Sequence, residues 1–193
     1  MRTRLLSFTL IFAFVMVASC ASLETRTGRA AYMSGDYRSA IRELTPFAEQ
    51  GNAEAQYLLG ASYANASPPE QDYSRAERWL QAAAEQGHAD AMADIAKLNL
   101  FYKNERDMQK AIYWYMKAAD RGHPEAQFMT GTYYFSEDAG AEKDNVKAYM
   151  WWLLSASKGH PLAKLMLEKS LVKISPDEVQ KADQLAKEWK AVK

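Results

Sequence analysis

The sequence predicts an all-α fold: a right-handed α/α solenoid of about four helix pairs, with a capping helix at each end. The first observation is a motif of small residues, a glycine and an Ala-centred run, which occurs four times with its glycines 36, 35 and 37 residues apart. The second is an alanine eleven residues before each glycine. This period is typical of stacked helical repeats, whose units cannot bury their apolar faces alone. The glycines are Gly51, Gly87, Gly122 and Gly159, and the alanines are Ala40, Ala76, Ala111 and Ala148.

An aspartate lies fifteen residues before each glycine, and it predicts where each unit's first helix, helix A, begins. Aspartate is a favoured N-cap, and a glycine in the left-handed conformation closes a helix at its C-terminal end. The residue after the glycine, Asn or His, is predicted to be the N-cap of the second helix, helix B. These positions are Asp36, Asp72, Asp107 and Asp144, followed by Asn52, His88, His123 and His160.

The composition supports one domain and limits the partners it could bind by charge. Of the 193 residues, 48% are hydrophobic, and Lys+Arg and Asp+Glu both number 24. The formal net charge is therefore zero, and no long run of like charge occurs. Electrostatic attraction to nucleic acid or to anionic lipid headgroups is not supported, so we expect neither as a partner.

Residues 1–19 are predicted to be a bacterial lipoprotein signal peptide. Arg2 and Arg4 precede an apolar run over residues 5–17, which is too short for a membrane span of about 20 apolar residues. The run ends in Val17-Ala18-Ser19-Cys20, which resembles the lipobox whose cysteine is lipidated and becomes the mature N-terminus. The alternative is cleavage after Ala21 without lipidation.

The predicted location follows from this segment. Cys20 is the single cysteine, so it cannot form an intramolecular disulfide, and it would carry the lipid at the head of a tether over residues 20–27. Ala21, by resemblance to other lipoproteins, favours the outer membrane. We expect an exported chain anchored in the outer membrane and facing the periplasm, or otherwise a periplasmic one.

The aligned pattern resembles the Sel1-like repeat, a relative of the tetratricopeptide repeat. The clearest units are DYSRAERWLQAAAEQGHADA at 72–91 and DMQKAIYWYMKAADRGHPEA at 107–126. The first unit departs from the pattern, with Glu43 in place of tryptophan and Thr45-Pro46 expected to kink or shorten its helix A. The solenoid is predicted over residues 28–174, with units of about 36–71, 72–106, 107–143 and 144–174.

Both ends of the array are predicted to be capped, as solenoids require. Residues 26–35 have the pattern of a lone helix that leads into the first unit. Residues 175–193 begin with Ser175-Pro176-Asp177-Glu178, which combines an N-cap, a proline at the first helical position and an acidic first turn. An amphipathic helix is expected to follow and to pack on the last unit.

The aromatic residues predict both core and surface. Trp79, Trp114 and Trp151 share one repeat phase and are expected in the core between repeats. The adjacent aromatics of YWY (113–115) and YMWW (149–152) cannot all face one core, because neighbours on a helix are turned by about 100°. We predict a protein-binding patch from Tyr113, Tyr115, Tyr149 and Trp152, with Arg42 and Arg78 in the phase of Tyr113; for the two arginines a solvated face is the alternative.

No catalytic, metal or cofactor site is predicted. His88, His123 and His160 share one phase, so helix stacking separates them by 8–10 Å or more, too far to hold one metal ion. No phosphate-binding glycine loop or nucleophile motif occurs. The resemblance implies a membrane-anchored scaffold that binds another protein on its concave helical surface. The alternatives are a cell-wall or β-lactam-acting enzyme, whose relatives carry paired cysteines that this chain lacks, and a soluble periplasmic signalling regulator.

Overall fold

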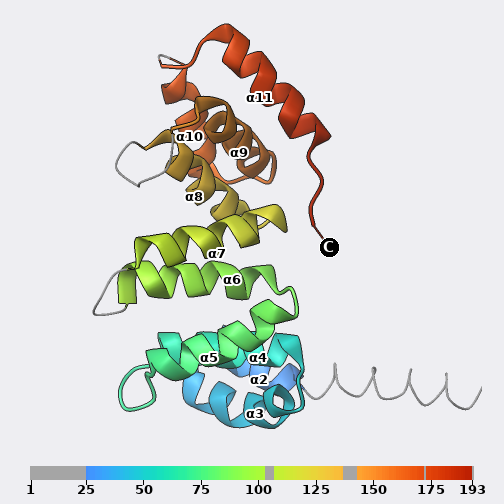
Figure 1. Cartoon of the computed structure of the whole chain (residues 1–193). Helices are drawn as coiled ribbons and strands as arrows, with labels where there is room; N and C mark the ends of the chain where they lie inside the picture. The colour runs from blue at the N-terminus through green and yellow to red at the C-terminus, as the bar shows by residue number, and fades with distance from the viewer. Residues whose placement is uncertain (1–24, 103–106, 137–142, 172, 193) are drawn as a thin grey trace, which may run out of the picture. The chain divides into compact units, whose positions relative to one another are not determined.

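The computed structural model describes residues 25–102, 107–136, 143–171 and 173–192, and all regular structure in these ranges is helical. The predicted all-α fold is therefore confirmed. The predicted signal peptide and Cys20 lie outside the described residues. The helices are α2 (Arg26–Met33), α3 (Tyr37–Glu49), α4 (Ala53–Asn65), α5 (Tyr73–Glu85), α6 (Ala89–Lys97), the π-helical turn η1 (Leu98–Tyr102), α7 (Met108–Asp120), α8 (Pro124–Phe135), α9 (Asn145–Ser157), α10 (Pro161–Ser170) and α11 (Pro176–Glu188) (Figure 1).

The helices fall into two compact units, which divide between Ala83 and Ala84. In the first unit α3 packs against α2 and α4. In the second, α7 packs against α6 and α8, and α9 packs against α8, α10 and α11 (Figure 1). In the described part of the chain, no helix is both long enough and apolar enough to span a bilayer.

The four predicted helix A starts are confirmed by their caps. The side chain of each aspartate accepts a hydrogen bond from the backbone N–H three residues later, at 2.8–3.1 Å. The four glycines at the helix junctions have φ between 85° and 91°, the left-handed conformation that favours glycine. The repeat spacing therefore corresponds to a repeated pair of helix-ending and helix-starting conformations.

The predicted helix B caps are confirmed at three of the four junctions. Asn52 Oδ1, His123 Nδ1 and His160 Nδ1 each accept from the backbone N–H three residues later, at 2.9, 3.2 and 3.3 Å. His88 also stands at the N-cap position but makes no capping hydrogen bond with its side chain. The histidines are thus junction residues, as the spacing predicts.

The first unit does not lose part of helix A to its proline. Helix α3 continues through Pro46 to Glu49, so the expectation of a shortened helix is wrong. The Thr45 hydroxyl donates to the Ile41 carbonyl oxygen at 2.6 Å. Leu44 and Ala48, on either side of the proline, are buried, and this burial holds the second half of the helix in place.

A small residue in one helix faces a large buried residue in the following helix A. An ideal Cβ on Gly60 of α4 would lie 2.8 Å from Leu80 Cγ, and one on Gly131 of α8 would lie 2.6 Å from Trp152 Cδ1. Backbone is equally close at Gly131, with the Ala148 carbonyl oxygen 2.9 Å from that position. Glycine therefore allows the two helices to approach until the large side chain is fully covered.

The fourth unit replaces this small residue by an exposed glutamate. Nine residues after the junction glycine stand Gly60, Ala96 and Gly131 in the first three units and Glu168 in the fourth. Among the described residues, α10 packs chiefly on α9, and α11 packs on α9 instead of continuing the stack. A helix A packed at this position would bury the Glu168 carboxylate, which is unfavourable without a partner.

The predicted caps are confirmed at both ends. Helix α2 packs on α3, and its Gly28 lies against Leu44. Helix α11 begins with a capping box, in which the Glu178 backbone N–H donates to Ser175 Oγ and the Ser175 backbone N–H donates to the Glu178 carboxylate. Trp189, at the end of α11, contacts Trp151 of α9 with ring centroids 6.0 Å apart.

We expect Gly131→Ala to lower the free energy of unfolding by about 1–3 kcal/mol, because the added methyl group would force α8 away from Trp152. Glu168→Ala is the matched control, since it changes the same repeat position where nothing packs, and it should stay within about 0.5 kcal/mol. Urea unfolding followed by circular dichroism measures both. Equal losses in the two variants would contradict the proposed helix contact.

We expect His160 to make stability depend on pH. Burial lowers the pKa of His160, with His123 adding to the effect and the Glu125 charge opposing it. The unfolded chain then binds the proton more readily, so stability is complete above a pH of about 6.5 and declines as the pH falls towards the lower folded-state value.

His160→Asn keeps a capping oxygen, as Asn52 does in the first unit, and removes the titration. Urea unfolding at pH 7.5 and 5.5 should show a smaller loss in this variant than in the parent chain. His160→Ala should lose about 1 kcal/mol at both pH values, because its cap is gone. An unchanged pH dependence in His160→Asn would refute the assignment.

Candidate functional site

An apolar pocket of about 180 Å³ lies in the second unit. The π-helical turn η1, the first half of α7 and the second half of α8 form its walls. Its lining combines aliphatic side chains, methionines and two tyrosine rings with a few hydroxyls: Leu100, Met108, Ile112, Tyr115, Met129, Thr130, Thr132, Tyr133 and Ser136. A pocket of this size and composition fits an apolar side chain better than a charged ligand.

Two large apolar residues associated with the pocket are exposed: one follows a lining residue in the sequence, and the other is itself a lining residue. The π turn places Leu100 in the wall, while its neighbour Phe101 is 64% exposed. Met108 lines the pocket and is itself 48% exposed. The Thr130 hydroxyl is buried, and among the described residues it has no hydrogen-bond partner. The region therefore offers an apolar contact surface that none of the described residues covers.

The π turn had no counterpart in the sequence prediction. Its Asn99 side chain is buried and donates to the Ile95 carbonyl oxygen at 2.8 Å, and its backbone carbonyl accepts from the Asp107 N–H at 3.1 Å. Turns of this type are often found at functional sites. Here the turn widens the end of α6 and directs Leu100 towards α7 and α8.

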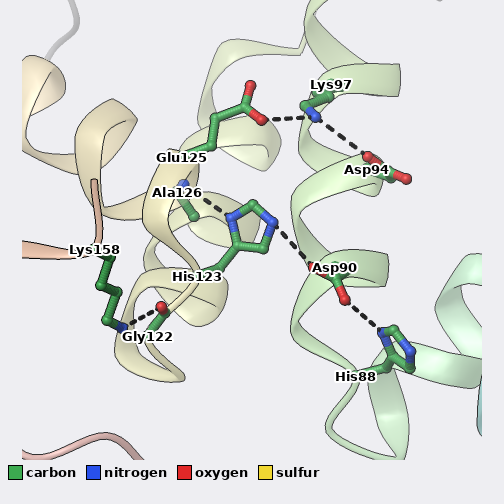
Figure 2. Close-up of polar contacts among 9 residues, drawn as sticks. All are labelled: His88, Asp90, Asp94, Lys97, Gly122, His123, Glu125, Ala126 and Lys158. Atoms are coloured by element: carbon green, nitrogen blue, oxygen red, sulfur yellow. Dashed lines mark hydrogen bonds and ion pairs between the residues drawn. The ribbon is translucent and has the colours of Figure 1, made fainter. Parts of the chain in front are cut away.

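A chain of polar contacts connects α6 with α8 in the same unit (Figure 2). His123 Nε2 lies 3.3 Å from one carboxylate oxygen of Asp90, and His88 Nδ1 lies 3.8 Å from the other. Lys97 lies 2.9 Å from Glu125 and 3.5 Å from Asp94. Two of these contacts, His123–Asp90 and Lys97–Glu125, join neighbouring repeats, so they fix how α8 lies against α6.

The environment shifts the ionisation of several groups in this chain. The hydrogen bond from His123 lowers the pKa of Asp90, and burial raises that of Asp94. Burial alone would lower the pKa of Lys97, but its contacts with Glu125 and Asp94 outweigh this and raise it. Lys97 therefore stays charged between its two carboxylates.

The geometry leaves His123 without a free nitrogen for proton transfer. Its Nδ1 accepts the Ala126 N–H at 3.2 Å, so its proton is on Nε2, which donates to Asp90. The arrangement acts to connect helices. Within the described ranges, no cluster of three or more His, Cys, Asp or Glu side chains could hold a metal ion.

Three of the predicted binding residues are core residues in the structure. Trp152, Tyr115 and Tyr149 are 0%, 3% and 8% exposed, and of the three only Tyr115 lines the pocket. Trp152 packs against Gly131 and Phe135. The burial of Trp152 and Tyr149 corrects their assignment to a binding patch, and Tyr115 takes part only as a wall of the pocket.

The repeat pattern itself could have predicted that Tyr115 and Trp152 are buried. Four residues after the repeated alanine stand Leu44, Leu80, Tyr115 and Trp152, and all four are buried. In the first two units an aliphatic residue marks this position as core. The interpretation from adjacent aromatics overlooked that phase.

The remaining predicted binding residues are exposed. Tyr113 is 53% exposed, and the Lys117 ammonium lies 5.6 Å from its ring centroid. Arg42 contacts Glu43 at 2.9 Å, and the Arg78 guanidinium lies 5.6 Å from the Trp79 ring centroid. The pocket of η1, α7 and α8 does not include these three residues. Their role in binding stays a prediction.

The tryptophans predicted to be core residues are covered to different extents. Trp151 is 7% exposed and lies beneath Trp189 of the C-terminal helix. Trp79 is half-buried and packs against the core of the first unit. Trp114 is half-buried and meets Tyr113 edge to face, with ring centroids 5.3 Å apart. Only Trp151 is a buried residue in the strict sense.

Comparison with known proteins agrees with this geometry. The Sel1 repeat family model matches residues 53–88, 89–123 and 124–160, together more than half of the chain. Each matched unit runs from one helix B through the following helix A, and the first and third of them contain the small-against-large contact. No curated protein matches the chain.

Two solved structures are similar. One is a protective antigen of uropathogenic Escherichia coli with an SLR fold, at 30% identity and a TM-score of 0.69; the match covers 79% of this chain and 32% of that one. The other is a Sel1 repeat protein from Oxalobacter formigenes, at 34% identity and a TM-score of 0.59, covering 67% of this chain and 97% of that one. This chain thus spans about a third of the length of the antigen. It belongs to the Sel1 repeat family, and its fold is the all-α solenoid of that family.

Proposed function

We propose that the chain is an exported, lipid-anchored scaffold that binds a partner polypeptide by receiving one of its apolar side chains in the pocket of η1, α7 and α8. Proteins built from Sel1 repeats are typically non-enzymatic scaffolds for protein interactions, which supports the general role. The observation that carries the specific proposal is the apolar pocket, whose lining residue Met108 is half exposed and whose lining residue Leu100 is followed in the π turn by the exposed Phe101.

The contact surface has the composition of an interaction site. Large apolar side chains such as Phe101 usually leave water when a partner is available, and a pocket gives such contacts a fixed geometry. The buried Thr130 hydroxyl has no hydrogen-bond partner among the described residues, so it is available to form one hydrogen bond with a polar group of the partner. The walls come from rigid helices and the π turn, so the partner meets a largely formed surface.

The anchor is supported by the sequence around Cys20. A lipid on this residue would confine the repeats to a membrane surface and raise their local concentration near partners there. The signal segment and the lipobox-like Val17-Ala18-Ser19-Cys20 carry this part of the proposal. Outer-membrane placement rests on Ala21 alone.

If Cys20 carries a lipid, the chain is found in the membrane fraction, and replacing Cys20 should remove it from there. Cys20→Ser removes the acceptor thiol, so the chain should leave the washed membrane fraction or accumulate with its signal uncut. Fractionation with immunoblotting and the mass of the N-terminal peptide measure this. A native chain that begins at Ser22 without modification would disprove the anchor and leave the pocket proposal standing.

The pocket predicts a position-dependent cross-link. A photo-reactive amino acid at position 101 should capture a protein partner in intact cells, and Met108→Glu should reduce the yield about ten-fold, since a carboxylate at the pocket mouth opposes burial of an apolar group. Met108 is 48% exposed, so the fold should tolerate the change.

Met33→Glu is the matched control, because Met33 is 76% exposed, belongs to the other unit and does not line the pocket. The cross-link should persist in this variant. A product that both substitutions reduce alike, or that neither reduces, would count against the pocket as the binding site.

A further inference from the structure

The chain continues beyond α11 as a short extended segment, Trp189–Val192, that folds back over the second unit. Trp189 ends the helix with an extended conformation, φ −64° and ψ 137°. The segment then runs beside α9 towards the end of α7, as the red trace at the C-terminus shows (Figure 1). We call Trp189–Val192 the C-terminal strap.

The strap is held by one aromatic side chain and one backbone hydrogen bond. The Trp189 ring meets Trp151 at an interplanar angle of 71°, and the Lys158 ammonium lies 5.5 Å from its centroid. Three residues later, the Val192 N–H donates to the Asp120 carbonyl oxygen at 2.8 Å. These two contacts are those of an extended peptide with an aromatic anchor.

The surface beneath the strap has features suited to such a peptide. Lys158 donates to the Gly122 carbonyl oxygen, which fixes the cation beside the α7–α8 junction (Figure 2). A Cβ on Gly122 would lie 2.5 Å from Lys158 Nζ, so the glycine leaves space for the ammonium, and the Trp189 ring lies within van der Waals reach of the same position at 3.5 Å. The Asp120 carbonyl belongs to the last turn of α7, where carbonyls lack an intrahelical donor.

The strap itself has few other contacts. Lys190 and Ala191 are exposed, and Val192 is 54% exposed. Segments with few buried apolar contacts open at a much lower free energy than the core of a protein. Trp151, in contrast, is 7% exposed with the strap in place, so opening would uncover an aromatic surface.

We propose that the C-terminal strap is a self-ligand that a partner displaces from its site. The partner segment is extended, places an aromatic side chain where Trp189 lies, and donates a backbone N–H three residues later, as Val192 does. The site is formed by Trp151, Lys158, Gly122 and the Asp120 carbonyl. This site is separate from the pocket of η1, α7 and α8, and it does not depend on the function proposed for that pocket.

The intramolecular strap sets a threshold for any partner. A tethered ligand competes at an effective concentration on the order of millimolar, so a segment that binds only as well as the strap would remain excluded at lower concentrations. A partner must therefore bind more tightly than the strap or arrive at high local concentration. This makes binding at the site conditional.

The test uses the chain's own sequence as the probe. A labelled peptide of residues 186–193, AKEWKAVK, is titrated into the detergent-purified full chain, into Trp189→Ala, and into a chain that ends at Glu188. We expect the two variants to bind the peptide at least about ten-fold more tightly than the full chain does, because their site is open. NMR shifts of Trp151 and Lys158 report the location.

Two controls separate docking from unfolding or non-specific contact. The peptide AKEAKAVK, which lacks the aromatic anchor, should bind none of the chains, and Trp189→Phe should keep the site closed. Circular dichroism and thermal unfolding show whether each variant folds. Equal peptide affinity for the full chain and for folded Trp189→Ala would overturn the proposal. So would the absence of peptide binding to folded Trp189→Ala.

Discussion

The structure depends on one contact, in which a small residue of one helix meets the large residue four positions after the alanine of the following helix A. At Gly131 the backbone approach leaves no room for a methyl group, and Trp152 is wholly buried as a result. Gly60 and Leu80 make the same contact, and at both places it sets how closely the two helices approach. In the fourth unit the exposed Glu168 stands at the same position, and α11 packs on α9.

The same contact explains where the array leaves space. In the third unit Tyr115 stands at the large-residue position, and Ala96 stands at the small-residue position of the helix B before it. The Tyr115 ring nevertheless forms part of a pocket wall. The π turn follows α6 directly and carries Leu100 to the opposite wall. Burial, together with the charges of Glu125 and Asp94, raises the pKa of Tyr115, so the ring stays neutral beside the polar chain. The pocket thus arises from a local departure from regular helix stacking.

The sequence predicts features that occur in every repeat better than features that occur once. Features that repeat, such as the Asp36 cap or the left-handed Gly87, were predicted because several units report on each position. Trp152 was misplaced because its aromatic neighbours were weighed more than its phase. The pocket could not be predicted, because η1 occurs once and depends on tertiary packing around Asn99. A feature that occurs once cannot be compared with equivalent positions in other units, and that comparison is what made the repeated features predictable.

This distinction bears directly on function. Residues fixed by the repeat, including His123 and its bond to Asp90, are occupied in joining one helix to the next. Their hydrogen-bonding capacity is used within the fold, so they are poor candidates for recognising anything else. Recognition must come from features outside the repeat pattern, where groups remain available. The exposed Phe101 of the π turn and Trp189 after the final helix are such features, since neither occupies a position of the repeat.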